Sequence, residues 1–285
     1  MKKTFLIIGI ILLIIGIGFV GYGFYLKKTT NIQNPIATME VEDYGTIKIE
    51  LYPDKAPNTV ANFICLANRG FYNGLTFHRT IPNFMIQGGD KNGDGTGSPK
   101  LSDIRDDIEK KEENKNQENK KDNKLQDKEY SIKGEFIANG FTQNNLKHER
   151  GVISMARSGY EQMDPRLCEN AYNSAGSQFF IMTEKNYSLD GVYAAFGKVI
   201  EGMDVVDKIV NTEVYYRDSD KLESDKIPKN EEGMTIAPDT PKKAPVIKSL
   251  KVDTFGVEYG RPRTLDVFDY SSWIMQQYGG GLPVQ

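Results

Sequence analysis

The sequence predicts a mainly β fold, a closed antiparallel β-barrel capped by two α-helices, with one transmembrane helix at its N-terminus. Three observations lead to this prediction. Short β-rich runs recur at regular spacing between turn residues, two segments show helical periodicity, and one long run near the N-terminus is uncharged. The length of 285 residues allows one sizeable domain with attachments, or two small domains.

The uncharged run Thr4–Leu26 is long enough to span a bilayer as a helix. A cleaved signal peptide has a shorter apolar core, so we expect an uncleaved signal anchor over residues 1–28, with cleavage as the alternative. Lysine pairs flank both ends, and the positive-inside rule therefore does not fix the orientation. Because the N-terminal side offers little to translocate, we predict a single-pass cell-membrane protein whose main domain lies outside the cytoplasm. Residues 29–34 then form a short tether.

Residues 36–52 predict a β-hairpin, because apolar and polar residues alternate over residues 47–52 after an Asp-Tyr-Gly turn. Residues 56–70 predict the first helix. Its apolar residues recur with helical spacing, Pro57 suits the first turn and Gly70 suits the end.

The remaining strands are predicted from short β-rich runs. They are residues 75–89, 151–157, 177–183, 193–200 and 244–255. Residues 201–210 predict the second helix, with Met203, Val206 and Ile209 facing inward.

Two segments do not fit the barrel pattern. Residues 110–129 hold 13 charged residues of 20 and a single leucine, so they cannot bury a core. We expect a solvated insertion over about residues 98–130. Residues 256–285 form a C-terminal extension, whose aromatic residues and Trp273 suggest docking on another surface.

Composition excludes several classes of function. Residues 29–285 hold 32 basic and 39 acidic residues, a net charge of −7, and this makes nucleic acid an unsuitable partner. Cys65 and Cys168 do not make a disulfide framework. His78 and His148 are the only histidines and lie in no zinc-binding pattern, so we expect no metal site and two structural histidines.

The segment FHRTIPNFMIQGGD, residues 77–90, is too apolar for a surface loop, yet its Arg79 and Gln87 are too polar for a plain core strand. Together with ELYPDKAPNTVANF, IKGEF, GVISMAR, NSAGSQFFI and LDGVYAAFGKVIEGMDVV, in this order, it resembles the cyclophilins, which are peptidyl-prolyl cis-trans isomerases. The resemblance is strongest to their bacterial branch and covers about residues 35–255. It implies an eight-stranded barrel with a groove for proline-containing polypeptides and no cofactor.

The resemblance also implies which residues form the groove. Arg79 and Gln87 correspond to the catalytic residues, and Gln87 and Gln178 hold the peptide backbone and the arginine. The substrate-binding residues are Phe84, Met85, Ala156, Arg157, Gln178, Phe180, Leu189 and Tyr193, with Phe196 packing beneath the pocket. From the residues alone, alternatives remain open. Arg79 could pair with an acid at the barrel rim, Phe84, Met85 and Phe180 could be core residues, and Gln178 could close a barrel hydrogen bond.

The chain departs from the family pattern at several positions. Ser188 stands where many eukaryotic members have a tryptophan that helps to bind cyclosporin, so we expect weak cyclosporin binding. Tyr193 replaces a histidine, and Arg157 replaces a common asparagine whose contact we expect to be mainly through the backbone. An insertion at about residues 158–176 borders the groove, where it could narrow the substrate range or cover the site.

The resemblance implies a folding catalyst that accelerates rotation about X-Pro bonds, here in exported or surface polypeptides. Two alternatives remain open from the sequence. One is a non-catalytic module that binds proline peptides, and the other is a scaffold on the cell surface. Isomerase activity that is lost in an Arg79→Ala variant separates the enzyme from both.

Overall fold

The computed structural model of the protein describes residues 33–105 and 127–279. The predicted span Thr4–Leu26 and most of the charged insertion lie outside the described residues. Among the residues that are described, no helix is both long enough and apolar enough to cross a membrane.

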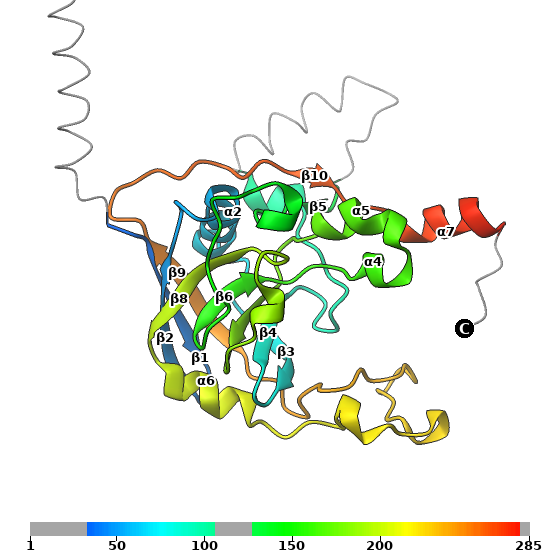
Figure 1. The fold of residues 1–285 in the computed structure, drawn as a ribbon. Helices are drawn as coiled ribbons and strands as arrows, with labels where there is room; N and C mark the ends of the chain where they lie inside the picture. The colour runs from blue at the N-terminus through cyan, green and yellow to red at the C-terminus, as the bar shows by residue number, and fades with distance from the viewer. Residues whose placement is uncertain (1–32, 106–126, 280–285) are drawn as a thin grey trace, which may run out of the picture. The chain divides into compact units, whose positions relative to one another are not determined.

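Eight strands form one antiparallel sheet, as the sequence predicts (Figure 1). They are β1 (Ile36–Val41), β2 (Gly45–Leu51), β3 (Thr76–Ile81), β4 (Met85–Asp90), β6 (Val152–Met155), β7 (Phe179–Met182), β8 (Ala195–Glu201) and β9 (Ile247–Asp253). Their order in the sheet is β3-β4-β7-β6-β8-β2-β1-β9. Every predicted β-rich run contributes a strand, and the first two strands form the expected hairpin.

The predicted full closure of the barrel is wrong, because the outer strands β3 and β9 do not form a ladder in the described part of the chain. They meet through one bridge, Thr76 with Val246, and through hydrogen bonds of the adjoining backbone. Farther along β3, the N–H of Thr80 donates to the carbonyl of Asp239 at 3.0 Å. Asp239 belongs to the loop of residues 211–246, which therefore occupies the place that a closing strand would take. The result is a curled, half-open barrel.

The two predicted capping helices are present as α2 (Pro57–Asn68) and α6 (Met203–Val210). Pro57 lies in the first turn of α2, as expected, because its missing N–H would be unpaired there anyway. The carboxylate of Glu135, from a distant segment, accepts the N–H groups of Asn58 and Thr59 at 3.0 and 2.8 Å. This contact satisfies free donors of the first turn and places a negative charge at the positive end of the helix.

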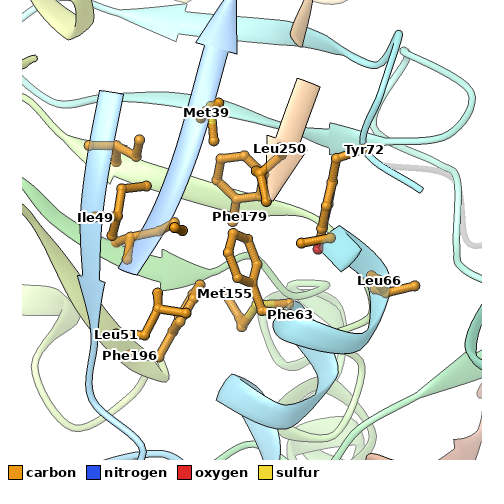
Figure 2. Close-up of a cluster of buried hydrophobic side chains, with 14 of the residues drawn as sticks. Met39, Ile49, Leu51, Phe63, Leu66, Tyr72, Met155, Phe179, Phe196 and Leu250 are labelled. Atoms are coloured by element: carbon orange, nitrogen blue, oxygen red, sulfur yellow. The ribbon is translucent and has the colours of Figure 1, made fainter. Parts of the chain in front are cut away.

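The main hydrophobic core lies between α2 and the concave side of the sheet (Figure 2). At its centre, the ring of Phe63 on α2 packs 5.3 Å from Tyr72, 5.8 Å from Phe179 and 5.2 Å from Phe196, measured between ring centroids. The hydroxyl of Tyr72 donates to the carbonyl of Ser177, so this buried polar group is satisfied. Phe196 is fully buried, as expected for a residue beneath the groove.

The insertion at residues 158–176 contains the short helices α4 (Tyr160–Met163) and α5 (Cys168–Tyr172), with the 3₁₀ turn η3 (Pro165–Leu167) between them. Cys168 and Cys65 are both free thiols. The charged insertion begins with the 3₁₀ turn η1 (Leu101–Ile104) and is closed at its base by a bridge between Lys100 and Glu129.

The C-terminal extension docks on the same chain. Its strand β10 (Leu265–Asp266) pairs with β5 (Tyr130–Ser131), and its helix α7 (Tyr270–Tyr278) lies beside the insertion (Figure 1). The ring of Tyr160 in the insertion stacks on Tyr270 at 5.2 Å and meets Phe268 edge-on at 5.5 Å. The guanidinium of Arg166 lies 5.2 Å from the ring of Trp273. The aromatic residues of the tail therefore bind the 158–176 insertion.

Candidate active site

A row of functional side chains crosses the sheet from β3 to β6. Arg79 is the register partner of Gln87, Gln87 of Phe180, and Phe180 of Ser154. Register partners in antiparallel strands point to the same face of a sheet. The strand pairing therefore aligns a guanidinium, an amide and an aromatic ring, in that order, on one face.

Beside this row, an apolar cluster lies apart from the main core. Met85 and Phe180 are its buried members from the predicted pocket, at 2% and 5% exposure. Phe84, Ala156, Leu189 and Tyr193 pack against it while partly exposed. The rings of Phe180 and Tyr193 meet edge-on at 5.7 Å. The structure thus brings together six of the predicted substrate-binding residues in one place, separate from the residues that hold the barrel together.

The two predicted glutamines are bonded to each other. Nε2 of Gln87 donates to Oε1 of Gln178 at 3.0 Å, and Nε2 of Gln178 donates to the carbonyl of Gly95 at 2.9 Å. The turn that carries Gly95 is held by the buried carboxylate of Asp90, which accepts the N–H groups of Asp94 and Gly95. Gln178 therefore closes a structural hydrogen bond and also orients Gln87. The sequence analysis did not predict that Asp90 holds this turn, although Asp90 directly follows the Gly-Gly pair.

Arg79 projects from β3 with 42% of its side chain exposed. Its Nη2 lies 4.0 Å from Oδ2 of Asp239, a carboxylate that is only 4% exposed. Arg79 therefore pairs with an acidic residue at the rim of the barrel, which is one of the alternatives that the sequence left open. Through the strand pairing it also lies beside the apolar cluster. Asp239 was not among the predicted residues, because the 211–246 loop carries no periodic pattern that could place it.

Behind Phe180 lies a buried polar network. The ring of His148 stacks on Phe180 at 6.1 Å, its Nδ1 lies 3.1 Å from Asp190 Oδ1, and its Nε2 lies 3.2 Å from Ser154 Oγ. Burial lowers the pKa of His148, although the hydrogen bond that its ring makes to the carboxylate of Asp190 opposes this shift. Serine, histidine and carboxylate also form the hydrolase triad, but Ser154 and His148 are fully buried, so no substrate can reach them. The network supports the aromatic wall of the site.

His78, next to Arg79 in the chain, is also buried, and its burial lowers its pKa. Both histidines are therefore neutral near pH 7. Both ring nitrogens of His148 have hydrogen-bond partners, as expected for a structural histidine, whereas neither ring nitrogen of His78 has one among the described residues.

The side chain of Arg157 is buried, with 5% of its surface exposed. Its guanidinium lies between the rings of Tyr172 and Tyr193, at 4.9 and 4.6 Å, and donates to Oε1 of Glu161 at 2.6 Å. It also donates to the carbonyl of Val192 at 3.1 Å. Arg157 thus fastens the insertion to the wall of the site, an arrangement that the sequence did not predict.

The site continues past Ala156 into a hollow of about 390 Å³. Gln87, Gln178 and Ala156 line it on the side of the barrel, and Tyr160 and Phe268 line it on the side of the insertion and the tail. The insertion and the tail therefore form one wall of a space that adjoins the predicted catalytic residues.

Comparisons with known proteins place the chain in a family. The family described as "Cyclophilin type peptidyl-prolyl cis-trans isomerase/CLD" matches residues 36–232. Peptidyl-prolyl cis-trans isomerase B of Bacillus subtilis is 38% identical over 174 residues, which are 61% of this chain and 90% of that protein. A peptidyl-prolyl cis-trans isomerase of Synechococcus elongatus is 35% identical over 186 residues, covering 62% of this chain and 94% of that protein.

Among solved structures, a cyclophilin type isomerase of Cryptosporidium parvum is similar with a TM-score of 0.50 and 24% identity. The likeness covers 77% of this chain and 97% of that one, and it supports the fold alone.

Proposed function

Because the chain belongs to the family of cyclophilin-type peptidyl-prolyl cis-trans isomerases, we propose that the row from Arg79 to Phe180 and the apolar cluster beside it form its active site. The chain is an isomerase of X-Pro bonds and a folding catalyst. The observation that supports this location is the separate apolar cluster, because a catalyst of this reaction needs a dry slot for the proline ring next to a fixed cation.

The reaction makes and breaks no covalent bond. The X-Pro bond rotates slowly because its resonance must be lost, at a cost of about 18–20 kcal/mol. In the twisted state the prolyl nitrogen becomes pyramidal and gains a lone pair that can accept a hydrogen bond. A donor that reaches this nitrogen binds the twisted state more tightly than either planar form, and so lowers the barrier. Arginine suits this role because it stays protonated and presents a rigid set of donors.

In the proposed site, Arg79 supplies this donor. Phe84, Met85, Phe180 and Leu189 receive the proline ring, and Gln87 holds the peptide backbone while Gln178 orients it. Ala156 and Arg157 contact the substrate through their backbone, because the guanidinium of Arg157 is already occupied by Glu161 and two tyrosines.

A pair of adjacent phenylalanines tests the location of the pocket. Phe180 belongs to the apolar cluster, whereas Phe179 points to the other face and lies in the main core. We expect Phe180→Ala to lower kcat/KM for a proline peptide at least about tenfold, since it removes the aromatic wall of the slot. Phe179→Ala should lower the free energy of unfolding by about 3–5 kcal/mol, with the activity of the remaining folded protein preserved. Equal losses of activity in both variants would argue against the proposed pocket.

We also propose that the enzyme acts on exported or surface polypeptides from the outer side of the cell membrane, and that it belongs to the bacterial branch of the family. The uncharged run Thr4–Leu26 supports a membrane anchor, and relatives in two bacteria support the branch. Newly translocated chains arrive unfolded with slow X-Pro bonds, so a tethered isomerase would shorten their folding. Protease added to intact cells should degrade the domain if it lies outside, and protection of the domain would contradict this orientation.

Weak cyclosporin binding is a further part of the proposal. Ser188 is the exposed central residue of the 3₁₀ turn η4 (Tyr187–Leu189), where its hydroxyl donates to Oδ1 of Asn186. Its small side chain offers no indole surface to a ligand in the neighbouring pocket. Inhibition of the isomerase by cyclosporin should therefore improve in a Ser188→Trp variant, and an unchanged inhibition constant would contradict the explanation.

A further inference from the structure

The guanidinium of Arg79 has a fixed negative charge behind it. Its Nη2 lies 4.0 Å from Oδ2 of Asp239, and the two side chains differ sharply in exposure, 42% for Arg79 against 4% for Asp239. One end of the ion pair is thus buried in the protein while the other is exposed. We propose that Asp239 is a positioning residue of the isomerase, which sets the place of the Arg79 guanidinium. This inference rests on the proposed role of Arg79.

The backbone around Asp239 fixes the carboxylate. Asp239 has a φ of 63°, in the left-handed region that Asp and Asn tolerate better than most residues. Its N–H donates to the carbonyl of Tyr216 at 2.9 Å, and its carbonyl accepts the N–H of Thr80 at 3.0 Å. Thr80 follows Arg79 directly on β3. The 211–246 loop is therefore bonded to the strand that carries the arginine, and the distance between the two charges is set by the backbone.

A second arginine shares the carboxylate. Nη1 of Arg217 lies 3.3 Å from Oδ1 of Asp239 and also donates to the carbonyl of Thr80. The two oxygens of Asp239 thus face two different guanidinium groups. A carboxylate that paired with Arg79 alone would draw it into a short contact of about 2.7–2.9 Å and occupy its donors. Here Arg217 pairs with one oxygen, and Arg79 lies 4.0 Å from the other.

This arrangement suits the reaction. The charges of Arg79, Asp239 and Arg217 sum to +1, so the rim keeps a positive charge for the substrate. Arginine has a long, flexible side chain, and a misplacement of about 1 Å can cost a hundredfold in rate. A buried carboxylate that limits this motion raises the share of molecules in which Arg79 is ready to donate to the prolyl nitrogen.

The test is a double-mutant cycle on the full chain in mild detergent, with cis-to-trans relaxation of an Ala-Pro-Phe peptide as the assay. Asp239→Asn keeps the shape and the tolerance for positive φ but removes the charge. We expect it to lower kcat about tenfold and to leave KM within twofold. In an Arg79→Ala background, assayed at higher protein concentration, it should have no further effect.

An equal loss in both backgrounds would overturn the proposal, since Asp239 would then act on the fold and not through Arg79. A wild-type kcat in Asp239→Asn would overturn it as well. If Arg79→Ala alone kept the wild-type rate, the proposed role of Arg79 would fail first, so the two failures can be told apart.

A second variant covers the case in which Asp239→Asn does not fold. Arg217→Gln removes one of the two arginines that pair with the carboxylate of Asp239 and leaves Arg79. The guanidinium of Arg79 should then move closer to the carboxylate, and kcat should fall severalfold. In an Arg79→Ala background the same substitution should have no effect on kcat. An unchanged rate would overturn the proposal. Asp207→Asn is the control, because Asp207 also pairs with an arginine, Arg150, but belongs neither to the row from Arg79 to Phe180 nor to the apolar cluster. It should keep the wild-type rate.

Discussion

Two ion pairs of this protein have the same length and different surroundings. The N···O distance is 2.6 Å both between Arg157 and Glu161 and between Arg150 and Asp207. The side chains of the first pair are 5% and 21% exposed, and those of the second are 42% and 44% exposed. Each arginine also donates to a backbone carbonyl, Arg157 to that of Val192 and Arg150 to that of Thr183. Burial and the tyrosine contacts of Arg157 should therefore decide how the two arginines differ in their effect on stability.

Arg157→Ala should lower the free energy of unfolding by about 3–4 kcal/mol. Removing one partner of a buried pair costs about 3–5 kcal/mol, because the other charge remains without compensation. The partial exposure of Glu161 places the expected loss at the lower end of this range. The contacts with the rings of Tyr172 and Tyr193 are lost in the same substitution, and their contributions overlap with this cost instead of adding to it. Arg150→Ala should cost only about 0–1 kcal/mol, as exposed pairs do.

The assay is urea unfolding of the full chain in mild detergent, followed by circular dichroism of the sheet. The difference between the two variants should be at least about 2 kcal/mol, and both should keep the slope of the wild type. Equal costs, or a cost below about 1 kcal/mol for Arg157→Ala, would refute the argument that burial of this pair fastens the insertion to the groove wall.

Two further predictions concern pH and the glutamine pair. Burial lowers the pKa of both His78 and His148 below their unfolded values. The free energy of unfolding should therefore be highest above about pH 6.5 and should fall as the pH drops through the folded pKa values, by up to about 1.4 kcal/mol per pH unit for each histidine. A thermal midpoint that stays constant from pH 7 to pH 5 would contradict this prediction. Gln178→Ala should lower kcat/KM about tenfold, because it leaves Nε2 of Gln87 without its partner and frees the Gly95 turn; an unchanged kcat/KM would show that Gln87 needs no such support.

Much of the fold could be predicted from local sequence patterns. The alternation in residues 47–52 and the helical spacing after Pro57 depend only on neighbours in the chain, and both elements are present. The pocket residues came from the family resemblance, since spacing alone could not distinguish Phe180 in the cluster from Phe179 in the core. The structure separates them because successive residues of a strand point to opposite faces.

The features that sequence reasoning missed join residues that are distant in the chain. Glu135 caps a helix that begins at Pro57, and Asp239 reaches Arg79 from the opposite end of the domain. The barrel was expected to close. Instead, the carbonyl of Asp239 in this loop accepts the hydrogen bond from the N–H of Thr80, which a closing strand would need. No period or motif in residues 211–246 signals these contacts, because they depend on tertiary packing.

The central claim is that Arg79, at the edge of a separate apolar cluster, promotes rotation about the X-Pro bond. The most direct measurement is cis-to-trans relaxation of a short Ala-Pro-Phe peptide with the full chain and with Arg79→Ala, using Arg150→Ala as the control. We predict fast relaxation with the wild type and the control, and a loss of about 10²–10³ in kcat/KM for Arg79→Ala, as for removal of one donor to the transition state. Relaxation that is equally fast without Arg79 would contradict the claim.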